Sequence, residues 1–168
     1  MKVRNFCFAF VNNFWGFPEI RPSKLGHLAR PQLGRWVGAV SLSGELLCCG
    51  GGPKAALYHL RTLTPIDPDG LQIPQFSENG GSLHVIEIFS EENRIILGGE
   101  MQGKMYQTNL SGEVIAEIET SSSCLYSVVH LNSEPLKMMS CAGSSSKIDL
   151  CTANFSYRDR TVSFPTVL

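Results

Sequence analysis

The stretch from Ile88 to Leu110, IFSEENRIILGGEMQGKMYQTNL, decides the fold of this chain. A polar turn at Ser90–Asn93 separates one apolar run from the next, Ile95–Leu97. The paired glycines at 98–99 stop that second run, and a third begins at Lys104–Tyr106. Three short runs joined by tight turns are typical of an antiparallel meander. The β-branched residues and the glycine stop predict that the middle strand is buried on both faces.

The same unit of strand, glycine loop and strand occurs twice more. Its glycine-ended runs lie upstream at 46–52 and downstream at 138–143. In each unit the strand after the glycines carries a residue at a matching position: Tyr58, Tyr106 and Cys151, spaced 48 and 45 residues apart. A period in the mid-forties with four short strands per unit is that of a WD40-type propeller blade, roughly 40–45 residues. An aromatic residue usually holds this anchor position, so the third unit has lost it.

The repeat predicts an all-β fold, a WD40-type β-propeller fragment of about three four-stranded antiparallel blades. Residues 1–29 are expected to be an irregular N-terminal segment and linker, and 30–168 the partial propeller. The units run roughly over 36–67, 82–119 and 123–164. The predicted strands include 36–42, 46–49, 55–60 and 62–66 in the first unit, 113–118 as the outer strand of the second, and 125–131, 136–142, 147–151 and 161–164 in the third. Proline and Asp-Gly turn chemistry at 67–75 predicts a connection between units.

Composition excludes several functional classes. The chain has 168 residues with a net charge of −1, 43% hydrophobic and 17% charged residues, which fits one soluble globular unit. It has no basic field with which to bind nucleic acid through counterion release. No apolar run reaches the length of about twenty that spans a bilayer. The run at 6–11 is too short for a signal peptide. The sequons at Asn109 and Asn154 are therefore interpreted as polar residues at strand ends.

The six cysteines stand at positions 7, 48, 49, 124, 141 and 151. Four of them fall inside predicted buried strands, so we expect unpaired structural thiols in a reducing compartment. A structural zinc site needs closely spaced ligand pairs, and the spacing here offers none. The sequence therefore predicts no metal and no cofactor.

The motif closest to catalytic chemistry is Gly98–Met105, GGEMQGKM, which has the glycines and the lysine of a phosphate-binding loop. Met105 stands where that loop needs Ser or Thr, and a strand follows where the loop needs a helix. We interpret the segment as a hairpin turn. The four histidines lie far apart without a carboxylate at a recognisable spacing, and no cysteine–histidine signature is present. We therefore predict that the chain is not an enzyme.

Several stretches resemble the subunit-six family of the THO complex, in its C-terminal half. They are, in chain order, RPQLGRW at 30–36, CGGGP at 49–53, LYHLR at 57–61, NLSGE at 109–113 and CAG at 141–143. The resemblance covers about residues 30–168 and implies a WD40 propeller that works as a scaffold in nuclear mRNA processing and export. Tyr58 stands where the family usually has Trp. Three blades are fewer than the four to eight of a propeller, so we expect a truncated isoform or a partial gene model.

The resemblance implies other THO subunits as protein partners, a nuclear location, and no membrane or small-molecule substrate. Direct sequence-specific nucleic-acid binding is not expected. Another WD40 adaptor, such as a substrate receptor of a ubiquitin ligase, is the alternative function.

Candidate partner-binding residues are drawn from the loops at the blade rims, which carry binding on a rigid scaffold. Arg35 and Trp36 come first, since this residue pair is typical of interface anchors, although a core residue at the start of a strand is the favoured interpretation of Trp36. Arg61, Glu100 and Lys147 follow, with ordinary solvated charges as the alternative for each. Three blades are also expected to leave apolar flanks open, at residues such as Leu46–Cys49, Ile95–Leu97 and Val128-Val129.

Overall fold

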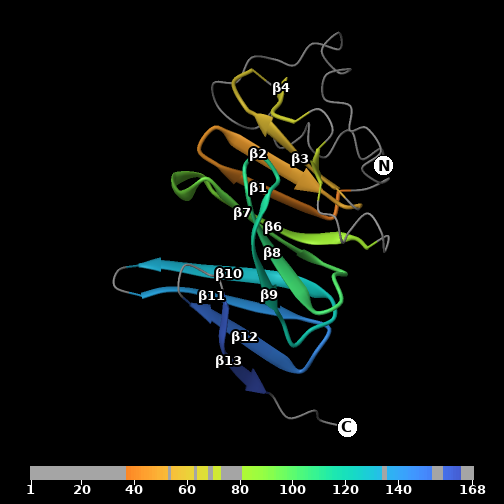
Figure 1. Ribbon diagram of the computed structural model, residues 1–168, viewed down its shortest axis with the longest axis vertical. Helices are drawn as coiled ribbons and strands as arrows, with labels where there is room; N and C mark the ends of the chain where they lie inside the picture. The colour runs from red at the N-terminus through yellow and green to blue at the C-terminus, as the bar shows by residue number, and fades with distance from the viewer. Residues whose placement is uncertain are drawn as a thin grey trace.

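A computed structural model of the chain describes residues 37–52, 54–62, 64–67, 70–72, 81–133, 136–152 and 157–163. These residues form thirteen strands in three antiparallel sheets (Figure 1). The first sheet contains β1 (Ala39–Ser43), β2 (Leu46–Gly50), β3 (Lys54–His59), β4 (Thr64–Pro65) and β5 (Leu71–Gln72). The second contains β6 (Leu83–Phe89), β7 (Arg94–Gly99), β8 (Lys104–Asn109) and β9 (Val114–Glu119). The third contains β10 (Leu125–Ser133), β11 (Leu136–Gly143), β12 (Lys147–Thr152) and β13 (Tyr157–Ser163).

The predicted all-β class with about three blades is confirmed. In the second and third sheets each strand pairs with the next one along the chain, in the order β6-β7-β8-β9 and β10-β11-β12-β13. Figure 1 shows the three sheets following one another in chain order, with the second between the other two. Strand β6 lies against β1 on one side and β10 on the other, so the first strands of the three units are neighbours.

The first sheet differs from the prediction at its outer edge. The expected fourth strand at 62–66 is reduced to the two residues of β4, which pair with one end of β3 through Tyr58 and Pro65. The predicted connection at 67–75 contains β5, whose Leu71 pairs with Ala55 at the other end of β3. Because Pro65 cannot donate a hydrogen bond to a ladder, a longer continuous strand is disfavoured there.

Asparagine side chains close the turns of the central sheet. Asn93 adopts a left-handed backbone (φ 53°) after the short 3-10 turn η2 (Ser90–Glu92), between β6 and β7. Asn109 ends β8, where its side-chain oxygen accepts hydrogen bonds from the backbone N–H groups of Ser111 (3.0 Å) and Glu113 (2.9 Å). Such local bonding is the reason asparagine favours turns. Asn109 is thus the strand-end polar residue that the sequence predicted, whereas Asn154 lies outside the described residues.

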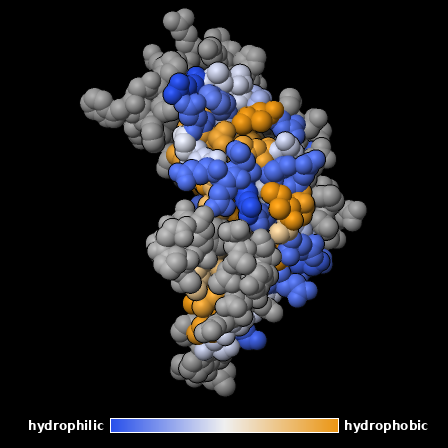
Figure 2. Space-filling view, turned by 60° about the vertical axis from the view of Figure 1, so that its left-hand side comes forward, coloured by the Kyte–Doolittle hydropathy of each residue, from blue (hydrophilic) through white to orange (hydrophobic). Residues whose placement is uncertain are grey.

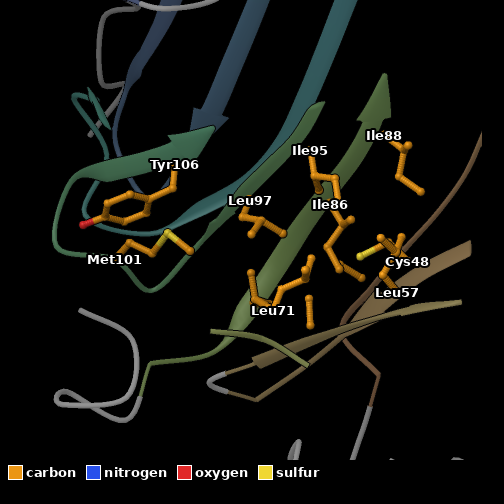
Figure 3. Packing of buried hydrophobic residues seen from close by; sticks show 12 residues of the cluster. Cys48, Leu57, Leu71, Ile86, Ile88, Ile95, Leu97, Met101 and Tyr106 are labelled. Carbon is orange, nitrogen blue, oxygen red and sulfur yellow. The ribbon is translucent and has the colours of Figure 1, made fainter. Parts of the chain in front are cut away.

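Two buried clusters join the sheets. Consecutive residues of β7 alternate between these two clusters. Leu97 packs toward the first sheet in a cluster that also contains Cys48, Leu57 and Tyr106 (Figure 3). Ile96 packs toward the third sheet with Val128 and other residues of β10–β12. Alternation along a strand sends neighbouring side chains to opposite faces. The central sheet is therefore apolar on both faces, as its unbroken run of β-branched and leucine side chains predicted.

The three anchor positions lie on corresponding faces of their sheets. Tyr106 packs in the cluster between the first and second sheets. Cys151 packs in the cluster between the second and third sheets. Tyr58 lies on the face of the first sheet that turns away from the second, in a third cluster with Leu47 and its neighbours. None of the three anchors is more than 4% exposed. The smaller Cys151 therefore occupies the place that an aromatic side chain holds in the other units.

The expectation of open apolar flanks is wrong for most of the residues named for it. Ile95–Leu97 are fully buried between sheets, and Leu47, Cys48 and Cys49 are at most 5% exposed. Val128 is buried against the second sheet, but its neighbour Val129 points the other way and is 62% exposed. Apolar surface remains on the outer face of the third sheet, where Val162 is also exposed, and at Ile66, Val114 and Ile115 in the other two units. On the face seen in Figure 2, exposed apolar side chains occur in separate places among polar ones.

A buried carboxylate fastens the third sheet to the chain that leads into it. Asp149 on β12 is 1% exposed and accepts hydrogen bonds from the backbone N–H (2.5 Å) and hydroxyl (2.7 Å) of Ser121. It also accepts the hydroxyl of Thr161 on β13 at 2.7 Å. Hydrogen bonds to a charged acceptor are each worth roughly 1.5–3 kcal/mol. Asp149 therefore ties the link before β10 to the outer strand of the same sheet.

Substitutions at the two adjacent positions of β7 should loosen opposite interfaces. We expect Leu97→Ala and Ile96→Ala each to lower the free energy of unfolding by about 2–5 kcal/mol, since each leaves a cavity in a fully buried cluster. Amide hydrogen exchange should then accelerate chiefly in β1–β3 for Leu97→Ala and chiefly in β10–β12 for Ile96→Ala. Identical exchange patterns in the two variants would contradict the assignment of these side chains to separate interfaces.

The outer face of the third sheet should drive self-association of the isolated chain. We expect the 168-residue chain to be oligomeric or aggregated, and Val129→Lys to reduce that association, because it places a charge in the exposed apolar face. The matched control is Val114→Lys on the edge strand β9, where Val114 is also exposed (41%). Size-exclusion chromatography measures both. A sharp monomer peak for the unsubstituted chain, with uniform amide protection in all three sheets, would contradict the prediction.

Candidate functional site

The predicted partner-binding residues that the structure describes lie in or next to three different sheets. Arg35 and Trp36 lie outside the described residues. Arg61 follows β3, with a side chain that is 75% exposed and forms an ion pair with Glu45. Glu45 also lies 3.2 Å from the ring Nε2 of His59, so it is shared between two basic side chains. Arg61 is thus part of a charged group at one rim of the first sheet.

The other two candidates belong to the second and third sheets. Lys147 begins β12 in the third sheet and is exposed, and its backbone N–H donates to the hydroxyl of Ser145 at 3.2 Å. Glu100 directly follows β7 and pairs through its backbone with Cys124, at the junction of the second and third sheets. Of the predicted residues, Glu100 has the most distinctive surroundings.

Four polar side chains from three segments of the chain meet at that junction. Nε2 of His84 lies 4.0 Å from a carboxylate oxygen of Glu100. The Cys124 thiol joins them, so that His84, Glu100 and Cys124 each present a ligand atom within 4.8 Å of the others. The ring of Tyr126 lies 5.5 Å from the His84 ring, centroid to centroid. A side-chain hydrogen bond with Cys124, followed by the charge effect of the same group, raises the pKa of the Tyr126 phenol. We call His84, Glu100, Cys124 and Tyr126 the junction cluster.

Two equivalent β-bulges create the junction cluster. On β6, Leu83 pairs with Gly99 and Val85 with Gly98, which leaves His84 as the extra residue. On β10, Leu125 and Ser127 pair with consecutive residues of β11, which leaves Tyr126 as the extra residue. A bulge re-aims the side chain that it contains. The first strands of neighbouring units thus carry the same irregularity, and it brings the rings of His84 and Tyr126 into a tilted contact.

Sequence reasoning missed this cluster. A carboxylate or thiol at a known short spacing from a histidine is the usual signal of such a group. Glu100 and Cys124 are instead 16 and 40 residues from His84. The signal that was available is the repeat itself, because His84 and Tyr126 stand directly after the buried leucines that begin β6 and β10. Equivalent positions in adjacent blades are neighbours at the rim. Only the bulges, which periodicity does not show, turn both side chains to the same place.

The glycine loop is a hairpin, as predicted. Gly99 packs against the backbone of Ser82, where a Cβ would clash with the carbonyl oxygen, and Gly103 has a left-handed backbone (φ 81°). Strand β8 starts at Lys104 in place of a helix. The Lys104 ammonium forms an ion pair with Glu117 on β9, and that hydrogen-bonded contact raises the pKa of Lys104. The lysine is therefore already engaged by a carboxylate of its own sheet.

The described cysteines, at positions 48, 49, 124, 141 and 151, are buried thiols. Burial raises the pKa of the Cys48 thiol to about 12, so this thiol stays protonated at neutral pH. Cys7 lies outside the described residues. Among the described residues, no helix has the length and apolar character needed to cross a membrane.

The chain is similar to curated proteins that share one name, THO complex subunit 6. The chain is 34% identical over 140 residues to THO complex subunit 6 of Homo sapiens and 32% identical over 131 residues to that of Drosophila melanogaster. It is 33% identical over 143 residues to the THO complex subunit 6 homolog of Danio rerio. These matches cover 78–84% of this chain but only 34–40% of the relatives. The chain thus spans well under half the length of the curated relatives that it matches. No protein-family model matches it.

The geometry of the glycine loop predicts that the chain does not bind ATP through Lys104. We expect no saturable ATP binding in equilibrium dialysis, and no difference between the unsubstituted chain and Lys104→Ala, since Glu117 already holds the ammonium. Arg94→Ala, which removes a basic side chain from the same sheet, is the control for a general change in charge. Tight ATP binding that Lys104→Ala abolishes and Arg94→Ala preserves would overturn this interpretation of the loop.

Proposed function

We propose that this chain is a non-enzymatic scaffold that assembles with other THO subunits, because it is a homologue of part of THO complex subunit 6. The observation that carries the proposal is about one-third identity with three curated relatives over about four fifths of this chain. In this proposal the chain acts in the nucleus, in mRNA processing and export. It makes protein contacts and has no small-molecule substrate.

The fold supports a role in protein contacts. Propeller blades are rigid sheets with loops at two rims, and binding residues concentrate on such loops. The junction cluster lies at such a place, and so does the charged group of Glu45, His59 and Arg61. We propose Arg61, Glu100 and Lys147 as contact residues within the described part of the chain, and Arg35 and Trp36 as further candidates.

The net charge also agrees with protein partners. At −1 the chain lacks the basic field that drives nucleic-acid binding. The outer strand β9 carries Glu117 and Glu119, and Glu113 directly precedes it. Such an edge also resists pairing with another strand. Contacts with RNA would then be made by other proteins of the assembly.

Affinity purification of the tagged full chain from nuclear extract tests this function. We expect THO subunits to be the enriched proteins, and we expect the triple variant Arg61→Ala, Glu100→Ala, Lys147→Ala to reduce their recovery at least fivefold. The control variant Glu91→Ala, Glu92→Ala removes two charges from the turn η2 and should not change recovery. Both variants should have the same circular dichroism spectrum as the unsubstituted chain.

Two outcomes would contradict the proposal. Recovery of a ubiquitin-ligase linker protein without THO subunits would favour the alternative adaptor function. Glycosylation at Asn109 or Asn154, detected by a mass shift after glycosidase treatment, would contradict a nuclear location. If the triple variant recovered THO subunits as well as the unsubstituted chain does, the proposed assembly with THO subunits would stand. Only the assignment of these three contact residues would be refuted.

A further inference from the structure

The junction cluster has the composition of a metal site. It combines one imidazole, one carboxylate and one thiol, whose ligand atoms all lie within 4.8 Å of one another. Nitrogen, oxygen and sulfur together are the ligand types of Zn²⁺, whereas Mg²⁺ and Ca²⁺ prefer oxygen alone. A thiolate and a carboxylate also balance the two positive charges of the ion. We propose that His84, Glu100 and Cys124 bind one Zn²⁺ ion.

The ligand spacing is close to what zinc requires. Zn–N and Zn–O bonds of about 2.0–2.2 Å and a Zn–S bond of about 2.3 Å place tetrahedral ligand atoms roughly 3.3–3.7 Å apart. The separation of His84 Nε2 from the Glu100 carboxylate is 4.0 Å, and the widest in the cluster is within 4.8 Å. A shift of about 1 Å by these side chains closes the site. Glu100 is half exposed and can make that movement without disturbing the core.

The backbone beneath the cluster holds the ligands in place. Glu100 and Cys124 face each other in an isolated antiparallel bridge. The Glu100 N–H donates to the carbonyl of Ser82 at 3.0 Å, and the Cys124 N–H donates to the hydroxyl of Ser144 at 3.1 Å. His84 lies between Leu83 and Val85, both buried in the cores. Ligands fixed by packing and hydrogen bonds of their own backbone are preorganised for binding.

Three protein ligands leave one position of a tetrahedral ion open. Tyr126 stands beside two of the ligands, through its ring contact with His84 and its hydrogen bond with Cys124. Tyr126 is itself 60% exposed and Glu100 is half exposed, so solvent reaches the cluster. The fourth ligand is thus water or a side chain of a bound protein. This inference is independent of the proposed function, because it rests only on the geometry of the cluster.

Metal titration of the full 168-residue chain tests the site. We expect one Zn²⁺ per chain in competition with a chromophoric chelator, and a near-ultraviolet thiolate-to-metal charge-transfer band when Co²⁺ is the probe. Cys124→Ser should abolish that band and weaken Zn²⁺ binding at least tenfold. His84→Gln should weaken binding to a similar extent. Glu100→Gln should weaken binding severalfold and keep the band.

Matched controls separate this site from adventitious binding. His59→Gln removes a histidine from the rim of the first sheet, and Cys49→Ala removes a buried thiol from the third cluster. Neither should change the affinity or the band. The proposal is overturned if the unsubstituted chain shows no charge-transfer band, or if the controls weaken binding as much as Cys124→Ser. Unchanged affinity in Glu100→Gln, which alters an exposed side chain and leaves the folded core intact, would also overturn a three-ligand site.

Discussion

The packing of the central sheet between two others is the constraint on which the rest of the structure depends. Ile95, Ile96 and Leu97 alternate between two buried clusters and have no exposed surface. Burial of a side chain of this size contributes roughly 1.5–3 kcal/mol, so a polar residue at any of these positions would cost the chain one interface or the other. The flanking sheets lack this symmetry, because only one face of each packs on the central sheet. The contact of each unit with its neighbours, more than any strand by itself, holds the fold together.

This constraint also explains where the chain can place chemistry. Side chains on the faces between sheets are committed to packing, and the outer strand β9 carries carboxylates that protect an edge. The free positions are at the ends of strands, where the register is broken. The bulges of β6 and β10 use that freedom, since each adds a residue that belongs to neither face. His84 and Tyr126 therefore leave the core at the same rim, where their rings lie in tilted contact.

The sequence was sufficient to predict the parts of the fold that periodic burial controls. The spacing of glycine-ended runs indicated three units, and the polar and glycine turns marked most strand ends in the second of them. It was insufficient where pairing depends on backbone detail. At the outer edge of the first sheet, two short strands, β4 and β5, both pair with β3. No local sequence pattern indicates this division. The junction cluster was missed for the same reason, because its residues meet through two bulges and an isolated bridge between Glu100 and Cys124. Of the five predicted contact residues, only Glu100 lies in it.

The position of the junction cluster links its geometry to the docking of two sheets. His84 and Glu100 belong to the second sheet, while Cys124 and Tyr126 belong to the start of the third. The cluster therefore exists only while β6 and β10 lie side by side, which in turn requires the buried contacts around Ile96. Asp149 also stabilises this junction, because it holds the link at Ser121 to the third sheet. A substitution that loosens this interface must also separate the residues of the junction cluster. The packing of the core and any chemistry at the rim are therefore not independent properties of this chain.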